Sequence, residues 1–234
     1  MAGQSPAARL LSIAKLYCIV REIMFGQFTA PCTRREARRI SRREAILDVA
    51  QGSFMECGYA GTTMSGIAAM LGGSKATLWS YFPCKEVLFA AVVDRASDSV
   101  RENMSLILNP QDDIGVTLGR FAREFLRKVT SPRALALNRL VIGEVARFPE
   151  TGRIFHERAV GRTHELLADY MAAVMERGLL RQAVPLVAAQ QLLGLCSSGC
   201  HHKLLLGAIG TAEPSVIEDD AERAVATFLR AYTA

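Results

Sequence analysis

Apolar residues along most of the chain recur every three or four positions, which is the spacing of helices with one buried face. The clearest stripe consists of Ile46, Val49, Ala50, Phe54 and Cys57. Just before it, Ser41 and Glu44 have the spacing of a capping box, in which two side chains satisfy free backbone amides at a helix start. Gly58 is typical of the residue that follows a helix end. The pattern predicts a first helix that begins near Ser41 and ends before Gly58.

Two short helices are predicted next, on either side of the glycine pair at 72–73. The first spans Thr63–Leu71, and Thr62 or Thr63 is its expected cap. The second spans Ser74–Phe82, with a serine cap at its first position. Two short helices joined by a glycine-containing turn are typical of a helix-turn-helix unit.

A fourth helix is predicted to start at Pro83 and to continue past Asp98, with a turn over 109–113. Beyond this turn, the apolar spacing predicts helices over Val116–Val129, Leu135–Phe148, Ile154–Arg177, Val187–Leu206 and Val216–Tyr232. The fold class that follows is all-α. We expect a partly basic, flexible tail over 1–38, a helix-turn-helix domain over 39–90 and a larger helical domain over 91–234.

Composition agrees with this fold class. Half of the 234 residues are apolar, which is enough for a core and excludes a disordered chain, and an aromatic content of 7% argues against a sandwich or barrel. The whole net charge of +5 lies in residues 1–93, because residues 94–234 contain as many acids as bases. The segment Arg34–Arg43 alone contributes six arginines. Such a basic front predicts a polyanionic partner at that end, with a solvated charged face as the alternative.

The six cysteines are scattered, and a chain of this length does not need disulfides, so reduced thiols and a cytoplasmic location are expected. The apolar stretch Ala7–Phe25 is interrupted by charges, and its longest uncharged run, Leu16–Val20, is too short for a signal-peptide core or for a membrane span of roughly 20 residues. Three interpretations of this N-terminal stretch stay open: an amphipathic surface helix, a tail outside the fold, or residues 1–23 lying upstream of a start near Met24. No function is assigned to them.

Three consecutive stretches resemble a known family. Residues 44–59 (EAILDVAQGSFMECGY), 62–72 (TTMSGIAAMLG) and 74–89 (SKATLWSYFPCKEVLF) are similar, in register, to the DNA-binding helices of the tetracycline-repressor (TetR) family of bacterial regulators. Residues 139–150 (RLVIGEVARFPE) more loosely resemble the ligand domains of some members. The resemblance implies an N-terminal three-helix DNA-binding domain and a C-terminal ligand-binding and dimerisation domain.

The residues of the second short helix fit a recognition helix. Leu78 and Phe82 lie four apart and face the core, whereas Lys75, Thr77, Trp79 and Ser80 lie off that stripe. The resemblance implies that the DNA backbone is held by Thr63, Ser74, Trp79, Tyr81 and Lys85. It also implies that the residues nearest the bases are Lys75, Ala76, Thr77 and Ser80.

Four positions depart from the family pattern. Trp79 replaces a usual tyrosine, so its ring donates one hydrogen bond but accepts none. Gly73 replaces a valine, Cys84 replaces a capping serine, and Gly66 stands where an acid is common. These changes predict a DNA-binding unit that is less rigid than usual and still binds DNA.

A group of aromatic, histidine and methionine residues in the C-terminal half is a candidate ligand pocket, although most such residues in any helical protein are ordinary core. The candidate lining residues are Phe121, Phe125, Phe148, His156, His164 and Met171. A pocket of this composition predicts a small, largely apolar effector with one or two polar atoms. Arg139 and Glu144 are charged on an otherwise apolar helix, and a surface position is favoured over a pocket position for both.

Cys196, Cys200 and His201 form the one cluster with metal-ligand chemistry. A metal- or thiol-responsive regulator is therefore an alternative, but the spacing lacks a second ligand pair, and Gly194, Ser198 and Gly199 instead favour close helix packing. No metal and no cofactor are expected. The chain has no phosphate-binding loop, nucleophile elbow or zinc-protease motif, so an enzyme is not expected, and an all-helical thiol enzyme is the remaining alternative of another class.

The sequence thus predicts a ligand-responsive transcriptional regulator, most simply a repressor. A homodimer would bind double-stranded DNA at a palindromic operator and would be released by the effector, with no membrane association. Val187–Leu206 is too apolar to face solvent and is predicted to pair, with Val216–Tyr232, against the same two helices of a second copy.

Overall fold

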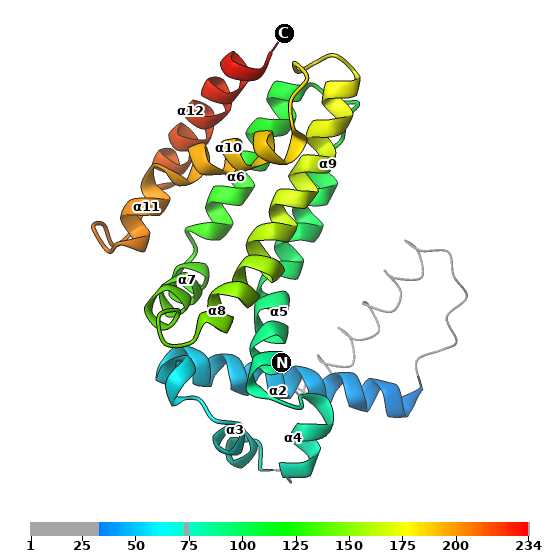
Figure 1. Cartoon of the computed structure of the whole chain (residues 1–234), viewed down its shortest axis with the longest axis vertical. Helices are drawn as coiled ribbons and strands as arrows, with labels where there is room; N and C mark the ends of the chain where they lie inside the picture. Colours follow the sequence, from blue (N-terminus) through cyan, green and yellow to red (C-terminus); the bar gives the residue numbers. More distant parts are fainter. Residues whose placement is uncertain (1–32, 73–74, 234) are drawn as a thin grey trace, which may run out of the picture.

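The computed structural model describes residues 33–72 and 75–233, and within these ranges every regular element is a helix (Figure 1). In chain order they are α2 (Arg34–Gly61), α3 (Met64–Met70), α4 (Lys75–Tyr81), α5 (Lys85–Ile107), α6 (Ile114–Val129), α7 (Pro132–Glu144), α8 (Pro149–Phe155), the π-helical stretch η1 (His156–Gly161), α9 (Arg162–Glu176), α10 (Pro185–Ser197), α11 (Cys200–Leu205) and α12 (Pro214–Tyr232). The predicted all-α fold is confirmed for these ranges. None of the described helices is long and apolar enough to cross a membrane.

One hydrophobic core, called here the lower core, lies at the end of the molecule that holds α3 and α4 (Figure 1). Buried residues of α2, α3, α4 and the first part of α5 form it together with residues of α7 and α8. Aromatic rings of Phe54, Tyr59, Phe89 and Phe148 contact one another there, with centroids 5.1 to 5.8 Å apart. Helices from beyond residue 130 therefore complete the core of the helix-turn-helix unit.

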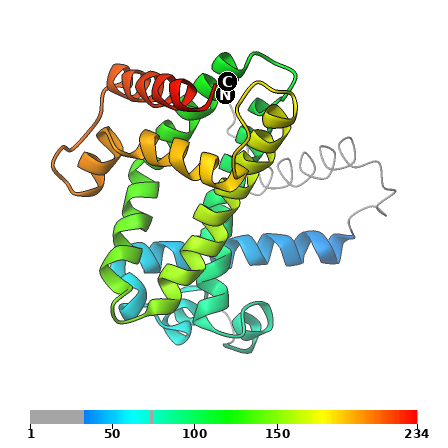
Figure 2. The same ribbon diagram turned by 45° about the horizontal axis from the view of Figure 1, so that its top comes forward.

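A second core, called here the upper core, is enclosed by α6, α9, α10 and α12, with Met104 of α5. Figures 1 and 2 both show α10 and α12 beside each other at the end opposite α4. The helix α5 contributes Phe89 to the lower core and Met104 to the upper core. The expected domain boundary after residue 90 thus falls inside a helix that belongs to both cores.

The first described helix begins earlier than the sequence pattern predicts. Thr33 is its cap: the Glu36 amide donates to Thr33 Oγ1 at 3.2 Å, and the Thr33 amide donates to Glu36 Oε2 at 2.9 Å. The expected start at Ser41 is wrong, because the same capping signature occurs eight residues earlier and arginine is a good helix former. Gly58, with φ of 72°, interrupts the helix as expected, since a left-handed conformation favours glycine.

Four prolines that break the apolar pattern stand at the beginning of helices. Pro132, Pro149, Pro185 and Pro214 occupy the first turn of α7, α8, α10 and α12, where no amide donor is required. The expected helices over Leu135–Phe148 and Ile154–Arg177 therefore begin at the prolines that precede them.

The expected single helix Val187–Leu206 is divided into α10 and α11. Gly199, with φ of −92° and ψ of −122°, separates them, and a Cβ at this position would collide with the Asp220 carboxylate. Asp220 of α12 accepts from the Cys200 amide at 2.7 Å, which satisfies the start of α11.

Candidate nucleic-acid interface and cavity

The helices α3 and α4 form one end of the molecule (Figure 1). Thr63 caps α3 by accepting from the Gly66 amide at 3.0 Å. Leu78 holds α4 in the lower core with 2% of its surface exposed. Because one face of α4 is buried in this way, its remaining faces are free to meet a partner.

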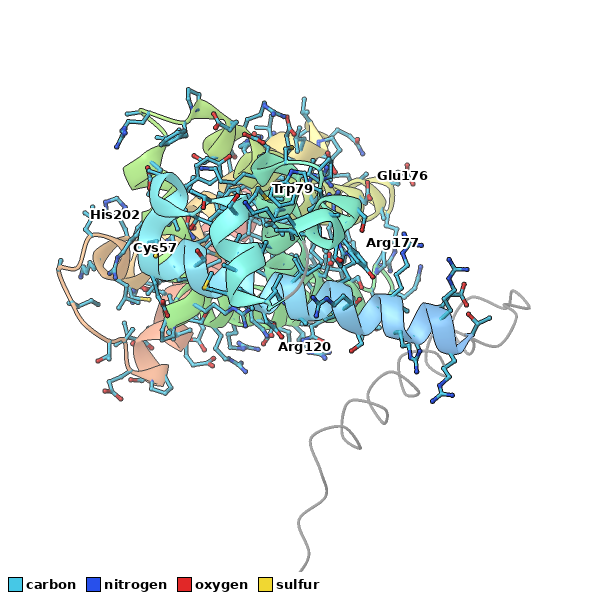
Figure 3. The ribbon with its side chains drawn as sticks, turned by 90° about the horizontal axis from the view of Figure 1, so that it is seen from below. Cys57, Trp79, Arg120, Glu176, Arg177 and His202 are labelled. Carbon is cyan, nitrogen blue, oxygen red and sulfur yellow. The ribbon has the colours of Figure 1, made fainter. Side chains whose placement is uncertain are left out.

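The predicted contact residues of α4 lie largely outside the core. Figure 3, viewed from this end, labels Trp79, whose side chain is 38% exposed. Lys75, Ala76 and Ser80 are exposed, whereas Thr77 and Tyr81 are half-buried. The Ser80 hydroxyl donates to the Thr77 carbonyl at 2.7 Å. The expected cap Ser74 and the departure at Gly73 lie outside the described residues.

Six arginines form a cationic face on the first turns of α2. Successive helical residues are about 100° apart, so one half of the helix carries Arg34, Arg35, Arg38, Arg39, Arg42 and Arg43. Figure 3 shows this part of α2 extending away from the α3–α4 end. The Arg43 guanidinium lies 5.6 Å from the centre of the Phe82 ring, directly after α4. This arginine face therefore continues the surface of α4 along α2.

The predicted contact residue Lys85 points into the protein instead. Its Nζ donates to the Tyr59 carbonyl at 2.9 Å and lies 4.1 Å from the centre of the Tyr59 ring. The Phe148 ring centre is 5.4 Å away. The half-buried ammonium is held by these rings and one carbonyl, so in this structure it links α5 to α2 and α8 and does not extend outward.

A cavity of about 700 Å³ lies where the two cores meet. Its walls come from α5, α6, α7, η1, α9, α10 and α11. Of the residues expected to line a pocket, Phe125 and His164 are on its wall. The volume is in the range that holds a drug-sized molecule.

The other four expected lining residues lie elsewhere. Phe121 and Met171 are fully buried in the upper core, and the ring of Phe121 stacks on that of Phe125 at 6.4 Å. Phe148 contacts Tyr59 in the lower core, and His156 is exposed at the start of η1. Phe121, Met171 and Phe148 are apolar and lie in the cores. Helical spacing alone does not distinguish a core residue from a residue of the cavity wall.

Arg95 of α5 connects the cavity wall to α2. Its Nη1 lies 2.7 Å from Asp48 Oδ1, and its Nη2 donates to Gln51 Oε1 at 2.8 Å. Arg133 of α7 also donates to Gln51 Oε1. The contacts among Asp48, Gln51, Arg95 and Arg133 are called here the α2 link. No sequence signal marked it, because charged residues at this spacing resemble an ordinary solvated face.

Two further residues of α7 have roles that the sequence did not predict. Glu144 Oε1 accepts from the Ala60 amide at 3.1 Å, which ties the end of α7 to the segment before α3. A Cβ at Gly58 would lie 2.6 Å from the same oxygen, so the close approach requires glycine. Arg139 donates to the carbonyls of Leu204 and Leu205 in α11.

Two histidines on the cavity wall are held neutral by their surroundings. Burial lowers the pKa of His164, and nearby His156 lowers it further. Burial also lowers the pKa of His201, although a hydrogen bond with the Ser197 backbone opposes this shift. A neutral imidazole suits a largely apolar cavity.

The cysteine cluster is buried next to the cavity. Cys196 is fully buried, and burial raises its pKa to about 12; the pKa of Cys200 is raised to about 11, again chiefly by burial. Thiols with raised pKa values are poor nucleophiles and poor metal ligands. Within the described ranges no group of three or more His, Cys, Asp or Glu side chains is arranged to hold a metal ion.

Two family models match the chain. Residues 46–92 match the model for bacterial regulatory proteins of the tetR family, and residues 116–234 match the model for the C-terminal domain of AefR-like transcriptional repressors. The second match alone spans half of the chain. Together the two models contain α3, α4 and most of the cavity wall.

Curated proteins match a part of the chain. The HTH-type transcriptional regulator RutR of Escherichia coli is 39% identical over 67 residues, which are 28% of this chain and 32% of that protein. The nucleoid occlusion factor SlmA of Marinobacter nauticus is 33% identical over 78 residues, 33% of this chain and 40% of that protein. The match thus spans about a third of the length of these curated relatives.

Solved structures match over most of the length. A protein of Mesorhizobium loti described as a TetR-family transcriptional regulator has a TM-score of 0.74 and 26% identity, covering 84% of this chain and 99% of its own. The flavonoid-responsive regulator FrrA has a TM-score of 0.70 and 29% identity, covering 82% of this chain and 97% of its own. Both helical regions therefore have the arrangement found in these regulators.

Proposed function

Because the chain belongs to the TetR family of transcriptional regulators, we propose that it represses transcription by binding a palindromic operator as a homodimer and that an effector in the cavity releases it. The observation that carries this proposal is α5, which contributes to both cores and to the cavity wall. A ligand that changes the position of α5 would change the position of α4, because both helices pack in the lower core.

In the proposed complex, α4 enters the major groove. Lys75, Ala76, Thr77 and Ser80 would lie nearest the bases. The backbone would be held by Thr63, Ser74, Trp79 and Tyr81, and by Lys85 if its ammonium leaves Tyr59. The arginine face of α2 would add phosphate contacts beside the groove, since arginine binds phosphate well and six of them lie on one half of the helix.

The proposed dimer contact is the outer face of α10 together with α12. On α10, Leu186 and Val187 are 42% and 41% exposed, and the exposed Ser198 continues this face. The exposed Gln190 and Gly194 lie between them and also border the cavity. Small and apolar residues on an exposed helix are typical of a surface that packs against a second copy. A two-fold dimer then requires an operator with two related half-sites.

The proposed effector is a small, largely apolar molecule. The cavity has a suitable volume, and FrrA, which is 29% identical, is named for its response to flavonoids. A metal- or thiol-responsive regulator is the second candidate, and the burial of Cys196 and Cys200 argues against it. A regulator of this kind needs no catalytic residue and no cofactor. It would act in the cytoplasm, because its DNA target lies there. Residues 39–90 would read the DNA and residues 91–234 would bind the effector and the second copy.

Selection of bound sequences from a random DNA library tests the proposal. The expected result is one palindromic sequence, bound with an affinity that falls steeply with salt, because basic residues displace counterions from the phosphates. Lys75→Ala should cost about 1–3 kcal/mol and relax specificity at one position if Lys75 reads a base. Recovery of unrelated sequences with equal affinity would contradict a specific regulator.

A further inference from the structure

The charged groups on the cavity wall all have the same sign. Among the described residues that line it, Arg95, Lys128 and Arg133 are cationic and none is an aspartate or glutamate. Arg133 is exposed and the Lys128 side chain is 36% exposed, so both lie where the cavity meets solvent. Arg95 is 21% exposed and lies deeper. Arg95 is paired with Asp48 and Glu44, and Lys128 with Glu124, so Arg133 is the wall cation that forms no ion pair with the described residues. An apolar cavity with such a cation favours an anionic group on its ligand.

Arg95 has a buried donor without a partner in the described part of the chain, and this donor is available for such a group. Its two terminal nitrogens are engaged by Asp48, Glu44 and Gln51. Its Nε is buried and has no hydrogen-bond partner among the described residues. A buried guanidinium donor without a partner is costly, and a ligand oxygen would remove that cost.

His201, which reaches the cavity from α11, presents the opposite kind of group. Its Nε2 is also buried and has no partner among the described residues. Burial lowers the pKa of His201, and a neutral imidazole has one nitrogen that donates and one that accepts. In the tautomer with the proton on Nδ1, Nε2 is the acceptor. The cavity therefore offers a hydrogen-bond acceptor at His201.

We propose that the effector is a largely apolar organic acid with a hydroxyl group: its carboxylate binds Arg95 Nε and the Arg133 guanidinium, and its hydroxyl donates to His201 Nε2. This inference rests on the proposed effector-binding function and specifies its ligand class. Lys128, at the opening, attracts the acid toward the cavity.

The same contacts give the acid a route to the DNA-binding helices. Arg95 and Arg133 both donate to Gln51 Oε1, and Arg95 also holds Asp48, so both arginines tie α5 and α7 to α2. A carboxylate on the Arg133 guanidinium competes with Gln51 Oε1 for this donor, and at Arg95 it binds the free Nε beside the nitrogens that hold Asp48 and Gln51. Binding of the acid thus weakens the α2 link, whereas a neutral ligand of the same shape leaves it intact.

The test uses isothermal titration calorimetry on the full chain with three probes of one shape. These are 4′-hydroxybiphenyl-4-carboxylic acid, its methyl ester, and biphenyl-4-carboxylic acid. The hydroxy acid should bind at least about tenfold tighter than its ester, because hydrogen bonds to an ionised group are the strong ones. It should also bind several-fold tighter than the acid without a hydroxyl.

Amino-acid substitutions test which residues bind the carboxylate and which residue binds the hydroxyl of the ligand. Arg133→Gln and Arg95→Gln should each reduce the acid-to-ester ratio severalfold, and Arg133 is exposed, so its replacement leaves the folded protein intact. His201→Phe should abolish the advantage of the hydroxyl group and leave the acid-to-ester ratio unchanged. Arg120→Gln is the matched control, since Arg120 is an exposed arginine of α6 that does not line the cavity.

Equal affinities for acid and ester in the unmodified protein, binding of none of the three probes, or an equal effect of Arg120→Gln would overturn the inference. Binding to the selected operator is measured in parallel without any probe. A chain that prefers the hydroxy acid but binds no DNA would support the ligand assignment and contradict the proposed function. A chain that binds DNA but treats acid and ester alike would contradict only the ligand assignment.

Discussion

The lower and upper cores are held together by different kinds of contact. Polar links between distant helices border the lower core: Glu144 to the Ala60 amide, Lys85 to the Tyr59 carbonyl, and the α2 link. The interior of the upper core is apolar, with the Phe228 and Tyr232 rings stacked at 4.5 Å, and its polar links, such as Tyr232 to Gln191 and Asp220 to the Cys200 amide, lie away from the DNA-binding helices. The cavity lies between the two cores. Polar links can exchange partners with a ligand while close-packed side chains stay in place, so the lower border is where a ligand signal would act.

The largest expected effect comes from the packed interior of the upper core. Phe121→Ala should lower the free energy of unfolding by about 3–5 kcal/mol, because Phe121 is fully buried and leaves a cavity. The same change at its stacking partner Phe125, which lines the existing cavity, should lower the free energy of unfolding by clearly less. Urea unfolding at fixed protein concentration measures both. Equal losses in free energy of unfolding at the two positions would mean that the cavity wall is packed as tightly as the upper core, which would contradict the contrast between them.

The outer face of α10 is predicted to matter for assembly and not for packing. Ser198→Arg places a charge on this exposed face and should give monomers, with a loss of operator affinity of roughly a hundredfold, about 2.7 kcal/mol. Analytical ultracentrifugation and fluorescence anisotropy measure the two effects. Ser105→Arg, at an exposed serine of α5, is the matched control. A dimeric Ser198→Arg protein would remove α10 from the interface.

Lys85 is predicted to hold the lower core together. Lys85→Met should lower the free energy of unfolding by about 1–2 kcal/mol, because it removes a cation–aromatic contact and a hydrogen bond to the Tyr59 carbonyl. The salt dependence of operator binding should stay unchanged. A reduced salt slope with unchanged stability would instead assign Lys85 to the DNA backbone, as its sequence position suggested.

The arginine face of α2 should show the opposite behaviour. Arg38→Gln combined with Arg39→Gln should reduce the slope of log affinity against log salt by about 1 to 2 units, since each phosphate contact contributes about 0.9. Melting temperature should barely change, because both side chains are exposed. If the slope is the same as that of the unmodified protein, the face is a solvated surface.

The smallest effect is a pH dependence confined to the cavity. Burial lowers the pKa of His164 and His201 below the ordinary value of 6.5, so the unfolded chain binds protons more readily than the folded one. Their contribution to stability is present above about pH 7 and decreases as the pH falls through 6.5. His201→Phe should make the melting temperature less sensitive between about pH 7 and 5. An unchanged pH profile would show that folding does not shift the pKa of His201.

The sequence predicted the elements that depend on local spacing and missed those that depend on contacts between distant helices. The buried positions Ile46, Ala50 and Phe54, the Thr63 cap and the break at Gly58 are local features, and the structure confirms them. Cys57, expected on the same buried stripe, is exposed because the helix is interrupted next to it at Gly58. The start of α2 was misplaced because two capping signatures compete within one basic segment. The apolar spacing placed several helix starts after the prolines at which α7, α8, α10 and α12 begin.

The candidate sites follow the same rule. The recognition helix could be predicted because its motif is contiguous, whereas the cavity wall combines residues of α5, α7 and α11. Phe121 and Phe125 are four residues apart on one helix, yet only Phe125 lines the cavity. Arg95 and Gln51 are 44 residues apart, so no pattern along the chain reveals their contact.

The central claim is that the cavity and the DNA-binding helices are coupled through the α2 link. The most direct measurement is the affinity of 4′-hydroxybiphenyl-4-carboxylic acid for the free protein and for the same protein saturated with operator. Coupling of about 1–3 kcal/mol predicts that operator weakens acid binding by about five- to 150-fold, and that the acid weakens operator binding by the same factor. Equal acid affinities with and without operator would contradict the account.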